Sequence, residues 1–381
     1  MHADALLCEE CGWRGPLALR YDCPDCGYSL SVGYDYQAVS AQDVRDALCA
    51  ARELWGFRLL LPLRDTKHKV SLHEGGTPLM KSTAIGKEHG VDLYFKDETR
   101  NPTCSFKDRP NTVGISVALE LGASAVAIAS TGNGAASLAA YAAKAGVPCR
   151  VFVPEQTSKR KVRQAVAHGA ELVKAPGSYS DAFRMCKEAC LQNGWANCTS
   201  TYLNPYTLEG DKTIAYEVCA RMGGAPDWVI VPLGAGPMLA GIYKGFVELR
   251  AFGLVDRLPK MAGVQAANCS PITTAFEQGR DEVTPVEVFD TVAHAIADPL
   301  TGYERDGTRT LRCIRRSDGC GVSIPEYLIK DFAVLVARDE GIYIEASSAA
   351  AVAAVPLMRQ RGFLSEGESV VAIITGHGLK D

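Results

Sequence analysis

The sequence predicts an α/β protein with a largely parallel sheet, preceded by a small cysteine-rich module. From about residue 71 onward, short β-rich runs alternate with longer helical stretches of small residues, a pattern typical of a parallel sheet covered by helices. Nearly all the strand candidates are continuous apolar runs, as burial on both faces requires. The first 35 residues, by contrast, are dense in Cys, Gly, Asp and Tyr and lack the apolar periodicity that a hydrophobic core needs.

Composition sets the scale of the fold and argues against two classes of function. With 381 residues, 47% of them hydrophobic, the chain can build a large core and a smaller module. Its net charge of -4 argues against a nucleic-acid-binding surface. No apolar run approaches the roughly 20 residues of a membrane helix, and the start of the chain lacks the basic and apolar blocks of a signal peptide. We therefore expect a cytoplasmic protein whose 14 cysteines are mostly reduced.

The order of these features along the chain suggests three parts. Residues 1–35 form the cysteine-rich module, residues 36–70 a connecting helix and linker, and residues 71–381 the main domain. In the connecting part, Ser40 is expected to cap an amphipathic helix that runs towards Trp55 and ends near Pro62. In the main domain the strand candidates are 92–96, 125–130, 149–154, 171–174, 228–232, 261–265 and 369–375. Open α/β sheets bind ligands at the carboxyl ends of their strands, so the loops that follow are candidate sites.

Two Cys-x-x-Cys pairs near the N-terminus have the spacing of a metal site. Their members are Cys8, Cys11, Cys23 and Cys26. Four thiolates in this arrangement suit tetrahedral zinc, and a glycine after each pair allows the chain to turn around the sulfurs. Two redox or disulfide pairs, or iron in the same cage, are the alternatives, and the missing export signal disfavours disulfides. Four protein ligands leave no open position, so a zinc ion here is expected to be structural and not catalytic.

Lys107 lies in a turn-rich loop that leads into an apolar helix over residues 112–121. An amine near the positive end of a helix dipole, beside Arg109, is expected to have a depressed pKa, which favours the neutral nucleophile needed for a Schiff base. On spacing alone a solvated surface lysine explains this position better, because lysines often precede helices. Three other loops, described next, favour the Schiff-base lysine over a surface lysine.

Three further loops follow predicted strands. The loop 130–133 joins a buried strand to a helix that ends at Gly146, and its N–H groups and Asn133 amide could bind a ring hydroxyl or a carboxylate; a plain capped helix is the alternative. The small residues of loop 234–241 let backbone amides close on an anion such as phosphate. Thr375 leaves the last strand, so its hydroxyl can bond a ligand, while His377 is expected to be a structural loop residue.

These blocks, in this order, resemble the threonine synthase branch of the fold-type II pyridoxal-phosphate enzymes over residues 72–381. The matching motifs are Ser105-Phe-Lys107-Asp-Arg109, Ser130-Thr-Gly-Asn133, Asn204-Pro-Tyr-Thr-Leu-Glu-Gly210, Glu345-Ala-Ser-Ser-Ala-Ala350 and Thr375-Gly-His-Gly-Leu-Lys-Asp381. The resemblance implies two open parallel-type sheet subdomains with the cofactor in the cleft, the smaller over roughly residues 112–214. It also implies a homodimer acting on a small amino acid, and some family members begin with a zinc-ribbon-like segment.

The resemblance also implies a role for each matched residue. Lys107 forms the Schiff base with pyridoxal phosphate and moves the substrate proton, Asn133 contacts the ring 3-hydroxyl, and Thr375 faces the pyridine nitrogen. The phosphate is held by Gly234, Ala235, Gly236, Pro237, Met238 and Leu239. The substrate is bound by Ser130, Thr131, Gly132 and Asn204. Because Thr375 carries a hydroxyl and no carboxylate, the cofactor is expected to be a mild electron sink, biased to elimination and replacement.

The activity that the resemblance implies is that of a carbon–oxygen lyase, which converts O-phosphohomoserine and water into threonine and phosphate. Departures from the family pattern keep a second activity open. Thr207 stands where the family usually has Arg, and Cys104 where it commonly has Gly. Loop 234–241 is closer to dehydratases, and the segment around Cys104 is similar to cysteate synthase. The alternative is therefore β-elimination or β-replacement on threonine, serine or O-phosphoserine. A cofactor-retaining interaction protein is the third hypothesis, which intact Lys107, Asn133 and Thr375 argue against.

Overall fold

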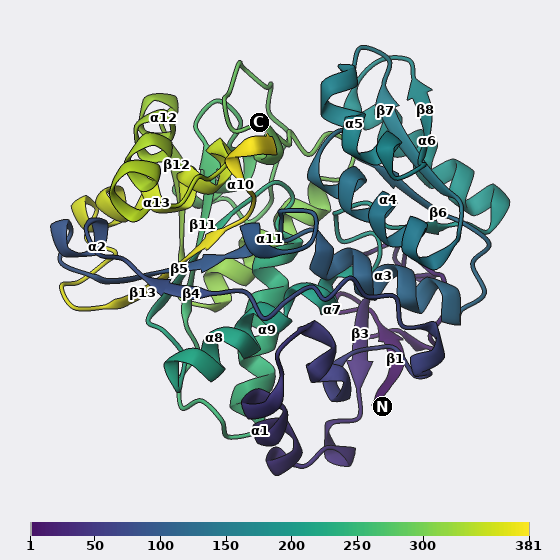
Figure 1. The fold of residues 1–381 in the computed structure, drawn as a ribbon, viewed down its shortest axis with the longest axis horizontal. Coiled ribbons are helices and arrows are strands. Elements are labelled where there is room, and N and C mark those ends of the chain that lie inside the picture. Colours follow the sequence, from purple (N-terminus) through teal and green to yellow (C-terminus); the bar gives the residue numbers. More distant parts are fainter. Residues whose placement is uncertain (1, 381) are drawn as a thin grey trace. The chain divides into compact units, whose positions relative to one another are not determined.

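The computed structural model describes residues 2–380 and divides into two compact units (Figure 1). The first unit comprises Met1–Gly76 and Asn101–Thr213, and the second comprises Thr77–Arg100 and Ile214–Asp381. The domain boundaries predicted at residues 35 and 70 both fall inside the first unit and stay predictions. Asp381, the last residue of the C-terminal motif, lies outside the described residues.

The second unit is built on a six-stranded sheet with the order β12-β11-β10-β13-β5-β4. Its strands are β4 (Leu79–Lys81), β5 (Asp92–Asp97), β10 (Trp228–Pro232), β11 (Lys260–Ala266), β12 (Cys320–Ile324) and β13 (Ser369–Ile374). All neighbouring pairs are parallel except β4 with β5. The sheet is therefore open and largely parallel, as the sequence predicts.

Both faces of this sheet are buried, which explains the continuous apolar runs of its strands. One face, with Ile230, Val264 and Ala372, packs in one core with α12 (Glu326–Leu335) and α13 (Ala346–Gln360). The intervening residues, such as Val229, are buried as well. The other helices of this unit are α2 (Ile85–Glu88), α9 (Pro237–Ala251), α10 (Pro271–Glu277) and α11 (Glu304–Arg316), and α8 (Thr213–Met222) starts at the last residue of the first unit.

The first unit contains a four-stranded parallel sheet with the order β8-β7-β6-β9. Its strands are β6 (Val126–Ala129), β7 (Cys149–Pro154), β8 (Glu171–Ala175) and β9 (Ala196–Asn197). On one face Ile128 and Val151 pack with α3 (Asp108–Glu120), α4 (Asn133–Ala145) and α5 (Lys159–Ala167). On the other, Ala129 and Phe152 pack with α6 (Tyr179–Asn193). A short helix, α7 (Thr207–Asp211), completes the unit.

The cysteine-rich module adds a three-stranded antiparallel sheet to the first unit, with the order β2-β1-β3. Its strands are β1 (Ala3–Leu7), β2 (Arg14–Gly15) and β3 (Ser31–Tyr34). Leu6 and Leu30 of the module share a buried cluster with Trp55 and with Val113 and Val117 of α3. The module is therefore packed against the rest of its unit, as its small apolar content requires.

The predicted elements compare closely with the observed ones. All seven predicted strands are present, whereas β4, β9 and β12 of the main domain and β1, β2 and β3 of the cysteine-rich module were not predicted. The predicted connecting helix, α1 (Ala41–Ala50), begins as expected, with Ser40 Oγ accepting from Asp43 N at 3.0 Å. The prediction that it continues towards Pro62 is wrong, because Leu54 N donates to Glu74 O at 2.9 Å and residues Leu54–Leu60 form a separate 3-10 segment. Among residues 2–380, no helix has the length and apolar character to cross a membrane.

Candidate cofactor and metal sites

Lys107 immediately precedes α3 in the first unit and is half-buried. Its ammonium lies 4.4 Å from the centroid of the Phe106 ring. The loop before it turns sharply at Cys104, which donates from its backbone N to Asn101 O at 2.8 Å and has a φ of 62°. A non-glycine residue with this left-handed backbone is strained, so the loop must be held by contacts elsewhere.

Asp108 provides those contacts from the first residue of α3. Its carboxylate accepts hydrogen bonds from Thr103 N at 2.7 Å, Thr103 Oγ1 at 2.6 Å and Ser137 Oγ at 2.7 Å. Burial raises the pKa of this carboxyl to about 6, while the hydrogen bonds from Ser137 and Thr103 oppose the rise. Because Ser137 belongs to α4, the Asp108 carboxylate ties the Lys107 loop to the helix that follows Ser130.

Two buried polar atoms flank Lys107 without a hydrogen-bond partner among residues 2–380. They are Ser105 Oγ and Asn111 Oδ1, two residues before and four residues after the lysine. A buried polar atom that is left unpaired costs free energy, so this pair fits a site completed by a polar ligand. Arg109 lies fully buried and donates from Nη1 to Thr213 Oγ1 at 2.9 Å. Its guanidinium is thus bonded within the protein.

The predicted loop Ser130, Thr131, Gly132 and Asn133 connects β6 to α4. All four residues are half-buried, and Asn133 is the first residue of the helix. Ser130 N donates to Phe152 O at 3.2 Å, and Gly132 N donates to Ser130 Oγ at 3.4 Å. The first turn of a helix leaves N–H groups without intrahelical acceptors, so this loop can bind a carboxylate or a ring hydroxyl.

Asn204 is buried in the turn before α7, where both ends of its amide bond to backbone. Its Nδ2 donates to Asn197 O at 2.8 Å, and its Oδ1 accepts from Tyr206 N at 3.0 Å. The backbone carbonyl oxygen of Asn204 accepts from Thr207 Oγ1 at 2.8 Å. The side chain therefore shapes the turn, and a direct contact with substrate stays a prediction.

The predicted phosphate loop lies in the second unit, between β10 and α9. It contains Gly234, Ala235, Gly236, Pro237, Met238 and Leu239. Thr310 of α11 donates to Ala235 O at 2.5 Å, and a Cβ at Gly236 would lie 2.4 Å from the Thr310 side chain. Gly236 also has a φ of 94°, so only glycine combines this backbone with this close approach. The loop is a tight cradle at the positive end of a 15-residue helix, which suits a phosphate group.

Thr375 follows β13 in the same unit and is buried with two polar side chains. Its hydroxyl lies 2.9 Å from Glu345 Oε1 and 2.8 Å from Ser348 Oγ. His377 is half-buried, and its Nδ1 accepts from Leu379 N at 3.1 Å, a local turn that agrees with the structural role expected for it. The orientation of the Thr375 hydroxyl therefore depends on Glu345 and Ser348.

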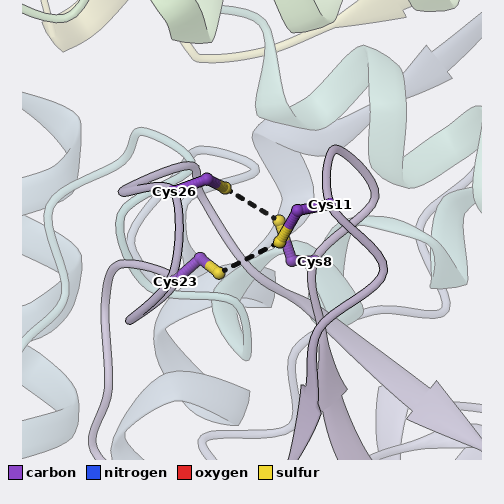
Figure 2. Close-up of side chains that lie close together, drawn as sticks. All are labelled: Cys8, Cys11, Cys23 and Cys26. Carbon is purple, nitrogen blue, oxygen red and sulfur yellow. Dashed lines mark hydrogen bonds between the residues drawn. The ribbon is translucent and has the colours of Figure 1, made fainter.

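The four N-terminal cysteines come together as the sequence predicts (Figure 2). Their sulfur atoms all lie within 4.8 Å of one another, with 3.5 Å between Cys8 and Cys26 and 3.6 Å between Cys11 and Cys23. A zinc ion bonded to four sulfurs at about 2.3 Å holds them roughly 3.8 Å apart. None of the four is in a disulfide, so the donor set fits a tetrahedral metal ion.

The two halves of this cluster have the same backbone geometry. Gly12 N donates to Cys8 O at 3.0 Å, and Gly27 N donates to Cys23 O at 2.9 Å. Both glycines have a positive φ, of 77° and 68° respectively. The turn after each pair, predicted from the position of these glycines, is therefore confirmed.

Sequence reasoning missed three residues that shape these sites. Asp108 and Glu345 stand inside the quoted motifs, so their positions were visible, but a motif does not say which atoms its side chains meet. Thr310 had no sequence signal, because it supports Ala235 from a helix that begins 69 residues later.

The chain is similar in sequence to known pyridoxal-phosphate-dependent enzymes. A family model described as pyridoxal-phosphate dependent enzyme matches residues 70–376. The threonine synthase of Methanocaldococcus jannaschii is 38% identical over 98% of this chain and 92% of its own length. That of Methanosarcina acetivorans is 40% identical over 99% and 92%. That of Mycobacterium bovis is 36% identical over 85% and 87%.

Solved structures with low sequence identity share the fold. Maize serine racemase aligns with a TM-score of 0.70 and 19% identity, over 90% of this chain and 94% of its own. The processed form of threonine deaminase isoform 2 from Solanum lycopersicum aligns with a TM-score of 0.66 and 20% identity, over 85% and 89%. Together with the two parallel sheets, these similarities confirm the predicted fold class, a fold-type II α/β enzyme.

Proposed function

Because this chain belongs to the threonine synthase family of pyridoxal-phosphate-dependent enzymes, we propose that it converts O-phosphohomoserine and water into threonine and phosphate. As a member of that family it is a lyase. The choice of substrate is the proposal. It is supported chiefly by relatives 38% and 40% identical over nearly the whole chain, the cysteine-rich module included.

Two sets of residues are proposed to hold the cofactor, which supplies an electron sink for the carbanion formed at the substrate Cα. In the first unit, Lys107 is the covalent attachment point, and Asn133 bonds the ring hydroxyl. In the second unit, residues 234–239 hold the phosphate, and Thr375 meets the ring nitrogen. The unpaired Ser105 Oγ and Asn111 Oδ1 support this assignment, since both lie on either side of Lys107.

The chain's own residues then have distinct tasks. Lys107 Nζ would hold the proton taken from the substrate Cα and would return it to another atom of the substrate. Ser130, Thr131 and Gly132 form the loop that binds the substrate carboxylate. Since Ser130 N already donates to Phe152 O, the Ser130 hydroxyl and the N–H groups of Thr131 and Gly132 are the proposed donors. Asn204 maintains the turn before α7 through its bonds to Asn197 O and Tyr206 N.

A substrate panel tests the proposal. Purified protein loaded with pyridoxal phosphate is incubated with O-phosphohomoserine, O-phosphoserine and threonine in turn, and released phosphate, ketoacids and amino acids are quantified. Threonine and phosphate in equal amounts from O-phosphohomoserine are expected. Turnover of only the other two compounds would reject the proposal in favour of β-chemistry.

One observation supports β-elimination or β-replacement on threonine, serine or O-phosphoserine as the second candidate. Thr207, which replaces the usual Arg, is buried, and its hydroxyl bonds to Asn204 O. Its methyl group would lie 2.9 Å from a Cβ at Gly114, so the side chain is packed against α3. This position thus supplies no guanidinium for a substrate phosphate.

We also propose that the four-cysteine cluster binds one structural zinc ion. The near-tetrahedral sulfur spacing supports this assignment, and the four protein ligands leave no position for a substrate. Serine at Cys8 and Cys23 should abolish stoichiometric zinc, measured by elemental analysis, while the visible absorbance of the cofactor persists. Serine at Cys49, an exposed cysteine outside the cluster, is the matched control. Zinc retained after the double substitution would refute the assignment.

Three wider expectations remain proposals. We propose that the protein works in the cytoplasm as a homodimer, with no nucleic-acid partner. The negative net charge supports the last point. Light scattering of the purified protein distinguishes a dimer of this 40.8 kDa chain from a monomer.

A further inference from the structure

The open edge of strand β9 is covered by side chains and not by a further strand, all within the first unit. Strand β9 lies at one end of its sheet, next to β6. The residues on either side of Asn197 donate their N–H groups towards β6, to Ala125 O at 2.9 Å and Ala127 O at 2.8 Å. Successive residues of a strand direct their backbone groups to opposite sides, so those of Asn197 face the open edge. Because Asn197 is fully buried, its N–H and C=O need partners within the protein.

Tyr21 of the cysteine-rich module supplies one of these partners. Its hydroxyl accepts from Asn197 N at 2.6 Å and donates to Trp195 O at 3.2 Å. The hydroxyl therefore offers β9 one acceptor and one donor, as a residue of a neighbouring strand would. Tyr21 is buried, and burial raises the pKa of its hydroxyl above the ordinary value, so the donor hydrogen is retained.

Asn204 supplies the other partner, and each end of its amide depends on the same part of the module. Its Nδ2 donates to Asn197 O at 2.8 Å, and its Oδ1 accepts from Tyr206 N at 3.0 Å. The Tyr206 hydroxyl accepts from Ala18 N and donates to Ala18 O, both at 3.0 Å. Both residues that bond the Asn204 amide are thus bonded to the module, one through Tyr21 and the other through Ala18.

Ala18 and Tyr21 lie in one loop, residues 12–22, which joins the two cysteine pairs. The sulfur atoms of Cys11 and Cys23, at the two ends of this loop, lie 3.6 Å apart. A metal ion bound to both sulfurs closes the loop, and a closed loop has fewer conformations than one whose ends can separate. The bonds from this loop to Asn197 and Tyr206 are therefore expected to depend on the metal.

We propose that the loop of residues 12–22 positions Asn204, with Tyr21 as a positioning residue that acts through Asn197. The inference rests on the proposed function in one respect, the predicted role of Asn204 in binding the substrate. The cysteine-rich module then contributes to substrate affinity as well as to stability, although none of its residues is assigned a contact with the substrate.

Hydrogen exchange of the cofactor-free protein tests this positioning without any turnover. Tyr21→Phe keeps the ring but removes the acceptor of Asn197 N–H. Amide exchange of peptides covering residues 195–210, measured by mass spectrometry, should be about tenfold faster than in the parent protein, while β7 exchanges at the parent rate. Tyr243→Phe, which removes a hydroxyl bonded to Arg316 O in the second unit, is the matched control and should change neither segment. Parent-like exchange in Tyr21→Phe would overturn the proposal.

Steady-state kinetics then show whether Tyr21 acts through Asn204. Tyr21→Phe should raise the KM for O-phosphohomoserine about tenfold, the effect of one lost hydrogen bond, and leave kcat within about twofold. In the Asn204→Ala background the same substitution should have no further effect on KM, because the residue through which it acts is already absent. Additive effects of the two substitutions would contradict the positioning role.

Removal of the metal should resemble Tyr21→Phe. The double variant Cys8→Ser with Cys23→Ser should exchange faster over residues 195–210 and have a raised KM. If this variant does not fold, parent protein stripped of zinc by a chelator replaces it. Parent-like exchange over residues 195–210 after zinc is shown to be lost would refute the dependence of the loop on the metal.

The two readouts separate failure of the inference from failure of the proposed function. If the parent protein does not turn over O-phosphohomoserine, the proposed function fails, and the exchange rates still decide whether the loop holds the turn. If turnover is as proposed but Tyr21→Phe changes neither the exchange nor the KM, the inference alone fails.

Discussion

Each unit buries one carboxylate beside a residue assigned to the cofactor, yet the two carboxylates have different partners. In the first unit, Asp108 accepts three hydrogen bonds from Thr103 and Ser137, two residues to which no ligand contact is assigned. In the second, Glu345 accepts from the Thr375 hydroxyl, which is itself proposed to meet the ligand. Burial of a carboxylate therefore does not define its role. Its role depends on whether the residue that donates to it is also assigned to the ligand, as Thr375 is and Thr103 and Ser137 are not.

The largest expected effect is on turnover, when Lys107 in the loop held by Asp108 is replaced. Lys107→Ala should lower turnover by about 10³-fold or more, because the covalent attachment and the proton transfer are both lost. Borohydride treatment followed by peptide mapping should find the cofactor on Lys107 in the parent protein. Lys144→Ala, which removes an exposed lysine of α4, is the control and should behave like the parent. If the cofactor maps to another lysine, Asp108 does not lie beside the attachment point, and the comparison of the two carboxylates fails.

The next largest effect is the contribution of Asp108 to the pH dependence of the free energy of unfolding. Folding raises its pKa from 3.8 to about 6, so the folded protein binds this proton more tightly than the unfolded chain does. The resulting stabilisation is complete below about pH 4 and is lost as the pH rises through 6, which costs on the order of 3 kcal/mol. Urea unfolding of the cofactor-free protein between pH 4 and 7 measures the slope. Asp108→Asn should lack this part of the slope, and an identical slope in the variant would contradict the assignment.

The two carboxylates should also differ when each is replaced by its amide. Asp108→Asn places an amide NH₂ against donors and should lower the free energy of unfolding at pH 7 by about 2 kcal/mol. Glu345→Gln should cost less than about 1 kcal/mol, because the Thr375 hydroxyl can donate to the amide oxygen as it does to the carboxylate. Urea unfolding of both cofactor-free variants gives the two values. Equal losses would mean that both carboxylates are structural.

The smallest effect is expected at the turn that Asp108 holds. Cys104→Gly relieves the left-handed backbone at this position, whose φ is 62°, and should stabilise the protein by about 1 kcal/mol. The thermal midpoint of the cofactor-free protein measures this gain. Cys49→Gly, at another exposed cysteine but within α1, should destabilise instead. No gain at Cys104 would show that the loop is not strained.

Much of the fold could be predicted from local patterns, and the exceptions share a cause. Strands β6 and β10 are continuous apolar runs, so burial on both faces is visible in the sequence. Strand β12 was missed because Cys, Gly and Ser weaken its signal, and its pairing with β11 alone defines it. The end of α1 was wrong because a bond from Leu54 to Glu74 competes with the helix. These choices depend on partners distant in the sequence.

By itself the sequence determined which groups are candidates for chemistry: the four cysteines, Lys107, and the small-residue loops after the strands. Each is a local pattern whose physical requirement, such as ligand spacing or a glycine turn, lies within a few residues. Only the tertiary structure decided how these groups are held. Thr375 meets Glu345 from 30 residues away, and Asp108 meets Ser137 from 29 residues away. Hydrogen bonds act over about 3 Å in space whatever the separation in sequence, so the fold alone assigns a role to each buried carboxylate.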